Sequence, residues 1–162
     1  MTLLSALQEA VEAQKRLRDL YALAADREKE KGALAFLIAL SVEKQRSMIF
    51  FMDRLAEAQG REGLGKAVLC PALKPPLPAP ECRPAVPSGE TRGRLEFIRQ
   101  ALGEEKKACS FFAGAKEGLA GEGKAWMASL EEIASGHILI LERIAGHLNF
   151  NGKFPDAAAL EE

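Results

Sequence analysis

The sequence predicts an all-α protein, a four-helix bundle built from two helical hairpins. Apolar residues recur at spacings of three, four and seven positions over four long segments. That period is typical of a helix with one buried face. A proline-rich stretch separates the second segment from the third, and no strand-like alternation of useful length occurs. At 162 residues, the chain is expected to form a single domain.

The first hairpin is expected to fill residues 2–59. Thr2 can cap a first helix that runs to about Lys31, with Gly32 as its stop. A second helix then runs from about Ala33 to Gln59, and Gly60 ends it. This second helix is apolar nearly all round. A helix buried on one side only should show a polar face, so a second surface of this helix is expected to be covered, either by the proline-rich crossover or by a second subunit.

The next segment, residues 60–93, is predicted to be a long crossover. A chain so rich in proline cannot be helical and should run extended. At ~3 Å per residue, these 34 residues can span a 25-residue helix of ~37 Å. Helices two and three can therefore run parallel, as in the ferritin-like topology. The prolines of this segment are Pro71, Pro75, Pro76, Pro78, Pro80, Pro84 and Pro87.

The second hairpin is expected to contain helices over about 94–119 and 124–148, with a break at Gly121 and Gly123. The bundle would then occupy residues 1–149, and residues 150–162 would form a C-terminal tail.

Polar residues interrupt the apolar stripes near the middle of each helix. Gln14, Glu43, Glu105 and His137 each have apolar neighbours three, four or seven positions away, so each should point into the core. A shift of 91 residues brings Gln14 onto Glu105 and Arg46 onto His137 without a gap. Burying polar groups costs free energy, so this repeated pattern predicts a polar centre inside the bundle.

The two hairpins, residues 3–58 and 95–148, resemble the rubrerythrin-like branch of the ferritin-like di-iron carboxylate superfamily. Helices one and three of that branch tend to read Glu-x-x-Ala-x-x-x-aromatic. The run from Glu105 to Phe112 matches this pattern, and the run from Gln14 to Tyr21 matches with Gln in place of Glu. The resemblance implies a ferritin-like fold and dinuclear iron chemistry, such as reduction of peroxide or dioxygen.

Helices two and four of that branch would carry Glu-x-x-His. This chain has Glu43-Lys-Gln-Arg46 and Ala134-Ser-Gly-His137 at those places. Three of six ligand positions therefore match the family: Glu43, Glu105 and His137. The other three ligands are replaced by Gln14, Arg46 and Ala134.

Three interpretations of this degenerate site stay open. In the first, no metal or other cofactor binds, Arg46 is the internal counter-charge, and the protein is a scaffold or partner-binding module. In the second, Glu43, Glu105 and His137 hold one Fe, Mn or Zn ion, which leaves open an iron-dependent oxidoreductase or peroxidase. In the third, Glu43 and Arg46 lie on the surface and His137 is an ordinary core histidine. An arginine only donates hydrogen bonds and would repel a cation, which favours the first.

The two apolar faces of helix two also predict a homodimer. The residues expected to be covered by the other subunit are Phe36, Ile38, Met48 or Phe51.

The charge balance, the apolar runs and the cysteines indicate which other partners and which compartment are expected. The 22 basic and 23 acidic residues are balanced, and no basic cluster with aromatics points to nucleic acid. The longest apolar run is too short for a membrane span. Three cysteines, an odd number, fit a reduced compartment, so a cytoplasmic location with Cys70 and Cys82 reduced is expected.

Overall fold

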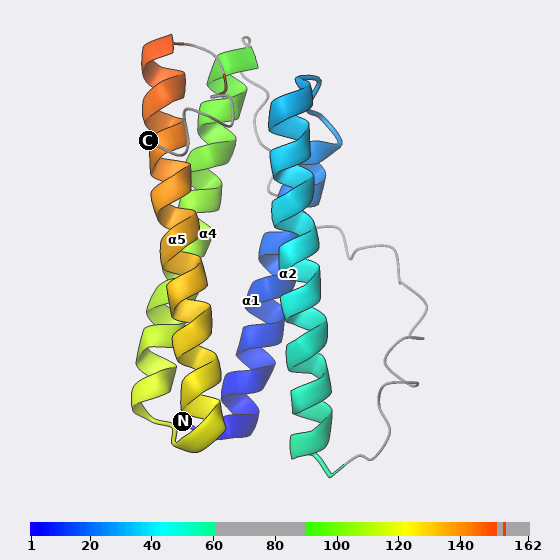
Figure 1. The fold of residues 1–162 in the computed structure, drawn as a ribbon, viewed down its shortest axis with the longest axis vertical. Coiled ribbons are helices and arrows are strands. Elements are labelled where there is room, and N and C mark those ends of the chain that lie inside the picture. Colours follow the sequence, from blue (N-terminus) through cyan, green and yellow to red (C-terminus); the bar gives the residue numbers. More distant parts are fainter. Residues whose placement is uncertain (61–89, 152–153, 155–162) are drawn as a thin grey trace.

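In the computed structural model, which describes residues 1–60, 90–151 and 154, the chain is a bundle of four long helices (Figure 1). This part of the chain contains no strand. The all-α, four-helix prediction is therefore confirmed. The helices are α1 (Leu3–Ala25), α2 (Lys31–Ala58), α4 (Glu90–Glu117) and α5 (Gly121–Asn151).

The helices alternate in direction around the bundle. In Figure 1, α1 and α5 run upward, and α2 and α4 run downward. Helices α1 and α2 pack along each other, as do α4 and α5, and α1 also contacts α4. The second and third helices are thus parallel, as expected. The predicted crossover falls mainly on residues 61–89, which lie outside the described residues together with Cys70, Cys82 and most of the predicted tail.

Several helix ends differ from the sequence-based prediction. Thr2 does cap α1, since its hydroxyl oxygen accepts from the backbone N–H of Ser5 at 3.1 Å. However, α1 ends at Ala25 rather than near Lys31, because the next backbone N–H groups, of Arg27 and Glu28, bond three residues back to Ala24 and Ala25 and so form a turn. The Glu28 carboxylate then accepts the backbone N–H groups of Lys29 and Glu30 before α2 begins. Gly60 follows α2 with a φ of 67°, the left-handed conformation that favours glycine at a helix end.

The helix ends of the second hairpin also differ from the prediction. Helix α4 begins at Glu90, four residues earlier than expected, and α5 runs from Gly121 to Asn151. Beyond α5, Phe154 is buried, and its ring packs on that of Phe36 with centroids 5.8 Å apart. The predicted tail therefore returns to the core at this residue.

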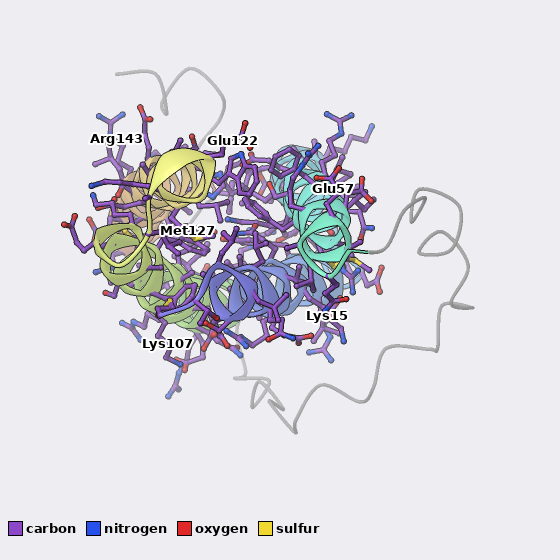
Figure 2. All side chains as sticks on the ribbon, turned by 90° about the horizontal axis from the view of Figure 1, so that it is seen from below. Lys15, Glu57, Lys107, Glu122, Met127 and Arg143 are labelled. Carbon is purple, nitrogen blue, oxygen red and sulfur yellow. The ribbon has the colours of Figure 1, made fainter. Side chains whose placement is uncertain are left out.

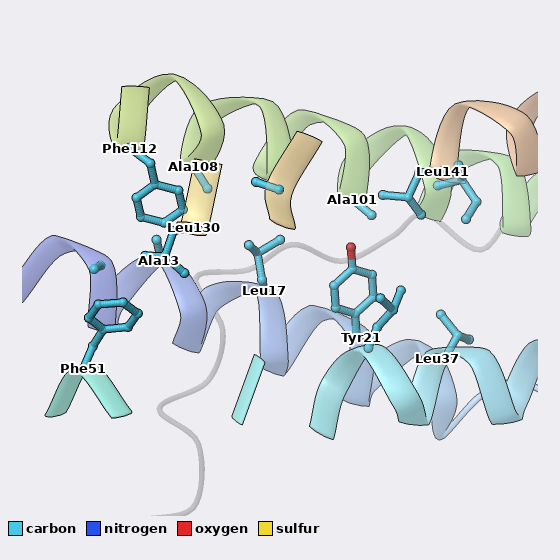
Figure 3. Packing of buried hydrophobic residues seen from close by; sticks show 14 of the residues in the cluster. Ala13, Leu17, Tyr21, Leu37, Phe51, Ala101, Ala108, Phe112, Leu130 and Leu141 are labelled. Carbon is cyan, nitrogen blue, oxygen red and sulfur yellow. The ribbon is translucent and has the colours of Figure 1, made fainter. Parts of the chain in front are cut away.

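One continuous apolar core fills the space between the two hairpins. Figure 3 shows Leu17 and Tyr21 of α1 facing Ala101 and Ala108 of α4. Seen from the end, Met127 points inward and Lys107 points away from the bundle (Figure 2). Alanines at the contacts let these helices approach closely, because a small side chain at one position leaves room for a large one opposite.

The internal repeat holds in the first helix of each hairpin and fails in the second. Positions 91 apart, such as Leu7 with Ile98 and Gln14 with Glu105, are buried in both α1 and α4. In α2 and α5, by contrast, the central buried polar residues are Lys44 and His137, which are 93 positions apart. The predicted gap-free pairing of Arg46 with His137 is therefore wrong.

Candidate functional site

Glu105 lies at the centre of the bundle with none of its surface exposed. Glu105 lies on the same face of α4 as Ile98, Ala101 and Ala108, and this face is buried in the core. The Tyr21 hydroxyl of α1 donates to its Oε1 at 2.9 Å. The Lys44 ammonium of α2 lies 2.9 Å from Oε1 and 3.1 Å from Oε2. Three helices therefore meet at this carboxylate.

Lys44 is buried as deeply as Glu105, with 1% of its surface exposed. It occupies the inward stripe of α2 between Leu40 and Met48, so its aliphatic stem packs as an apolar side chain would. A buried ammonium is tolerated only when it is paired. Its Nζ contacts both Glu105 oxygens and lies 2.9 Å from His137 Nδ1 on α5. Lys44 thus connects α2 to both helices of the second hairpin.

His137 lies between the buried pair and the edge of the bundle. Its Nδ1 lies 2.9 Å from Lys44 Nζ and 3.2 Å from Glu105 Oε1. Its Nε2 lies 3.2 Å from Oε1 and 3.3 Å from Oε2 of Glu43. The imidazole therefore joins the buried pair to a carboxylate at the edge of the bundle, where Glu43 is nearly half-exposed.

Charge at this site is balanced inside the core. Burial raises the pKa of Glu105, but the contacts with His137 and Lys44 outweigh burial and hold that pKa below its usual range. The Glu105 carboxylate also shifts the pKa of Tyr21, in the upward direction. Burial and the negative charge of Glu105 raise the pKa of Tyr21 far above its usual value. Tyr21 therefore stays a neutral hydrogen-bond donor to an ionised carboxylate. We call these five residues, Tyr21, Glu43, Lys44, Glu105 and His137, the Lys44 centre.

The residues predicted from sequence are partly brought together. Glu43, Glu105 and His137 do converge, since His137 Nδ1 also lies 3.2 Å from Glu105 Oε1. Gln14 and Ala134 are buried in the surrounding core. They are not in the Lys44 centre.

Arg46 does not enter the centre of the bundle. It lies on the exposed side of α2, so its predicted role as internal counter-charge is wrong. The buried cation is Lys44, two positions earlier. Its signal was present in the sequence, because Lys44 has Leu37, Leu40, Met48 and Phe51 seven and four positions away on either side. Because α2 is apolar nearly all round, its period alone does not indicate which face of the helix is buried.

A metal ion does not fit this arrangement of side chains. Lys44 Nζ takes up the space between Glu105 and His137 Nδ1, where a cation shared by those two ligands would lie. The ring nitrogens of His137 already face Lys44 and Glu43. In residues 1–60, 90–151 and 154, no group of three or more His, Cys, Asp or Glu side chains is arranged to hold a metal ion.

Comparisons with protein-family models, curated proteins and solved structures found no match to this chain. Within the described residues, no helix combines the length and apolar character needed to cross a membrane.

Proposed function

We propose that this protein is a rubrerythrin-like bundle whose central site works without metal, because Lys44 supplies the positive charge, and that it acts as a scaffold or partner-binding module. One observation carries the proposal. The Lys44 ammonium lies within 3.1 Å of both oxygens of the buried Glu105 and 2.9 Å from a ring nitrogen of His137. A carboxylate and an imidazole on facing helices are the ligands expected for a metal, and here they bind a side chain.

The charge count of the centre supports the same conclusion. In the di-iron proteins of this superfamily, four carboxylates from four helices offset the metal charge. Here the centre contains two carboxylates, and one of these, Glu43, is partly exposed to solvent. A single ammonium neutralises the buried one. An added divalent cation would meet the Lys44 charge at close range, which costs free energy in a poorly hydrated core.

The centre also offers little to a reacting substrate. Glu105 is fully buried and accepts hydrogen bonds from Tyr21 and Lys44. Tyr21 is held neutral. The side chains that could transfer a proton are therefore engaged with each other, and we assign their role to fixing how the two hairpins pack.

Metal addition tests this proposal. We expect protein purified without chelator to contain far less than one Fe, Mn or Zn per chain, measured by elemental analysis. We also expect its melting temperature to be unchanged by a stoichiometric amount of Fe(II), Mn(II) or Zn(II). A rise of several degrees in the wild type would refute the metal-free site, and would favour the single-metal alternative with Glu43, Glu105 and His137 as ligands.

The variant Lys44→Ala makes the test sharper. Removing the ammonium leaves Glu105 and His137 with an open space between them, so this variant should melt at a lower temperature and regain stability with Zn(II) or Mn(II). The matched control is Lys107→Ala, because Lys107 is an exposed lysine on α4. The control should respond to metal as the wild type does. Equal responses of all three proteins would contradict Lys44 as the substitute for metal charge.

A further inference from the structure

The outward face of α2 is apolar where an outer face is expected to be polar. Ile38 and Val42 are 48% and 43% exposed, and Ile49 is 39% exposed. On α1 the exposed positions at mid-helix are polar, for example Glu9, Glu12 and Arg16. An exposed apolar row of this kind is typical of an interaction surface.

The exposed row continues as a regular pattern. Ala35, Ile38, Val42, Gln45, Ile49 and Met52 follow one another at alternating steps of three and four, and all six are exposed or half-buried. We call them the outer seam. Such spacing is the a/d pattern that packs one helix against another in a coiled coil. The one polar member, Gln45, already accepts a hydrogen bond from Arg18 of α1 at 2.8 Å.

The outer seam can pack against the outer seam of a second, antiparallel copy. About a point between residues 43 and 44, Ile38 pairs with Ile49 and Val42 with Gln45. At the ends of the seam, the small Ala35 pairs with the large Met52. Layers that oppose a small with a large side chain pack well. In this alignment Gln45 is the one polar side chain of the seam, and a reversed second copy of the chain fits the seam in the remaining layers.

Charge complementarity favours the same reversed alignment. The exposed Lys31 at the start of α2 lies about one turn from Asp53 of the partner subunit, and nearly level with the partner's Glu57, which already pairs with Arg54 of its own chain at 2.7 Å. A parallel alignment would instead place Lys31, Arg46 and Asp53 opposite their own copies. Like charges in register oppose association. The charges therefore favour the antiparallel arrangement.

We propose that the outer seam is the interface of a two-fold symmetric homodimer in which α2 packs antiparallel on α2 of a second copy. The two-fold axis passes between residues 43 and 44. The interface spans residues 35–52, about 26 Å of helix. This inference rests on the outward face of α2, and so it does not depend on the Lys44 centre.

Three of the four residues expected from the sequence at the interface lie elsewhere. Met48 and Phe51, expected from the sequence to be covered by a second subunit, are buried inside their own bundle. Phe36 packs on Phe154 of the same chain. Among the four residues expected at the interface, Ile38 is the one that belongs to the outer seam.

Sedimentation velocity of the full chain at about 50 µM tests the dimer. We expect the wild type to sediment as a dimer, and Ile38→Glu and Ile49→Lys each to weaken dimerisation by about a hundredfold or more, because each buries an unpaired charge. Leu139→Glu is the matched control, since Leu139 is an exposed leucine on α5 outside the seam. It should leave the dimer intact. A monomeric wild type at this concentration, or equal loss in the control, overturns the proposal.

Mixing the two seam variants tests the register. In the antiparallel dimer, the glutamate introduced at position 38 of one copy would face the lysine introduced at position 49 of the other, while the remaining layer keeps its Ile38–Ile49 pair. The mixture of Ile38→Glu and Ile49→Lys should therefore form a heterodimer although neither forms a homodimer. Circular dichroism confirms that both variants remain helical. If the mixture stays monomeric, the antiparallel arrangement is refuted.

Discussion

The substitution Lys44→Met removes the buried positive charge and keeps the length of the side chain. Glu105 would then keep only Tyr21 and His137 as neighbours, in a site with none of its surface exposed. Breaking a buried ion pair by removing one partner costs ~3–5 kcal/mol. For a chain of this size, that corresponds to a fall in melting temperature of about 6–20 °C.

An exposed pair provides the control. Lys106 Nζ lies 2.8 Å from Glu142 Oε1, and this pair also joins α4 to α5, but both side chains are about half-exposed. Pairs of this kind contribute ~0–1 kcal/mol. Urea unfolding at pH 7 should therefore show a large loss for Lys44→Met and a small one for Lys106→Met. The two variants differ mainly in the burial of the pair that they break.

The pH dependence gives a second, independent measurement. In the wild type, the folded-state pKa of Glu105 is lowered, so its contribution to stability is present above the unfolded value of about 4.3 and is lost as the pH falls through the folded pKa. The variant Lys44→Met keeps the contact with His137 but loses the ammonium, so the pKa of Glu105 moves upward. The difference in unfolding free energy between the wild type and Lys44→Met should therefore be largest near pH 7 and should become smaller towards pH 4. A loss below 1 kcal/mol at pH 7, or one independent of pH, would refute this account of the centre.

Two further predictions concern the contacts around this centre and at the end of the bundle. Tyr21→Phe should cost ~1.5–3 kcal/mol by urea unfolding, because it removes a hydrogen bond to an ionised carboxylate. Since Tyr21 is the one tyrosine of the chain, absorbance near 295 nm should show no tyrosinate until alkali unfolds the protein, and ionisation near pH 10 in the folded state would contradict its raised pKa. Arg94→Met should cost ~1.5–3 kcal/mol at pH 7, because Arg94 Nε and a terminal guanidinium nitrogen bind the two oxygens of Glu28 at 2.9 and 2.6 Å. Since Arg94 lowers the pKa of Glu28 against the effect of burial, this loss should shrink below about pH 4, and a constant loss down to pH 3 would argue against the ion pair.

The sequence by itself determined the four helices and much of the core. In α1 and α4, apolar and polar residues separate clearly, so their period set the helix face. It correctly placed Gln14 and Glu105 inside, 91 positions apart. In α5 the stripe through Leu130, His137 and Ile144 was equally clear. Local periodicity is enough where only one face of a helix is apolar.

Tertiary structure alone decided which face of α2 turns inward. Because α2 is apolar nearly all round, its period fits two phases, one with Glu43 inside and one with Lys44 inside. Packing selects Lys44, since its long stem reaches from α2 to a carboxylate on α4 and an imidazole on α5. That choice depends on a charge 61 positions away, which no local pattern contains. It also turns Ile38, Val42 and Ile49 outward, where a second subunit can cover them.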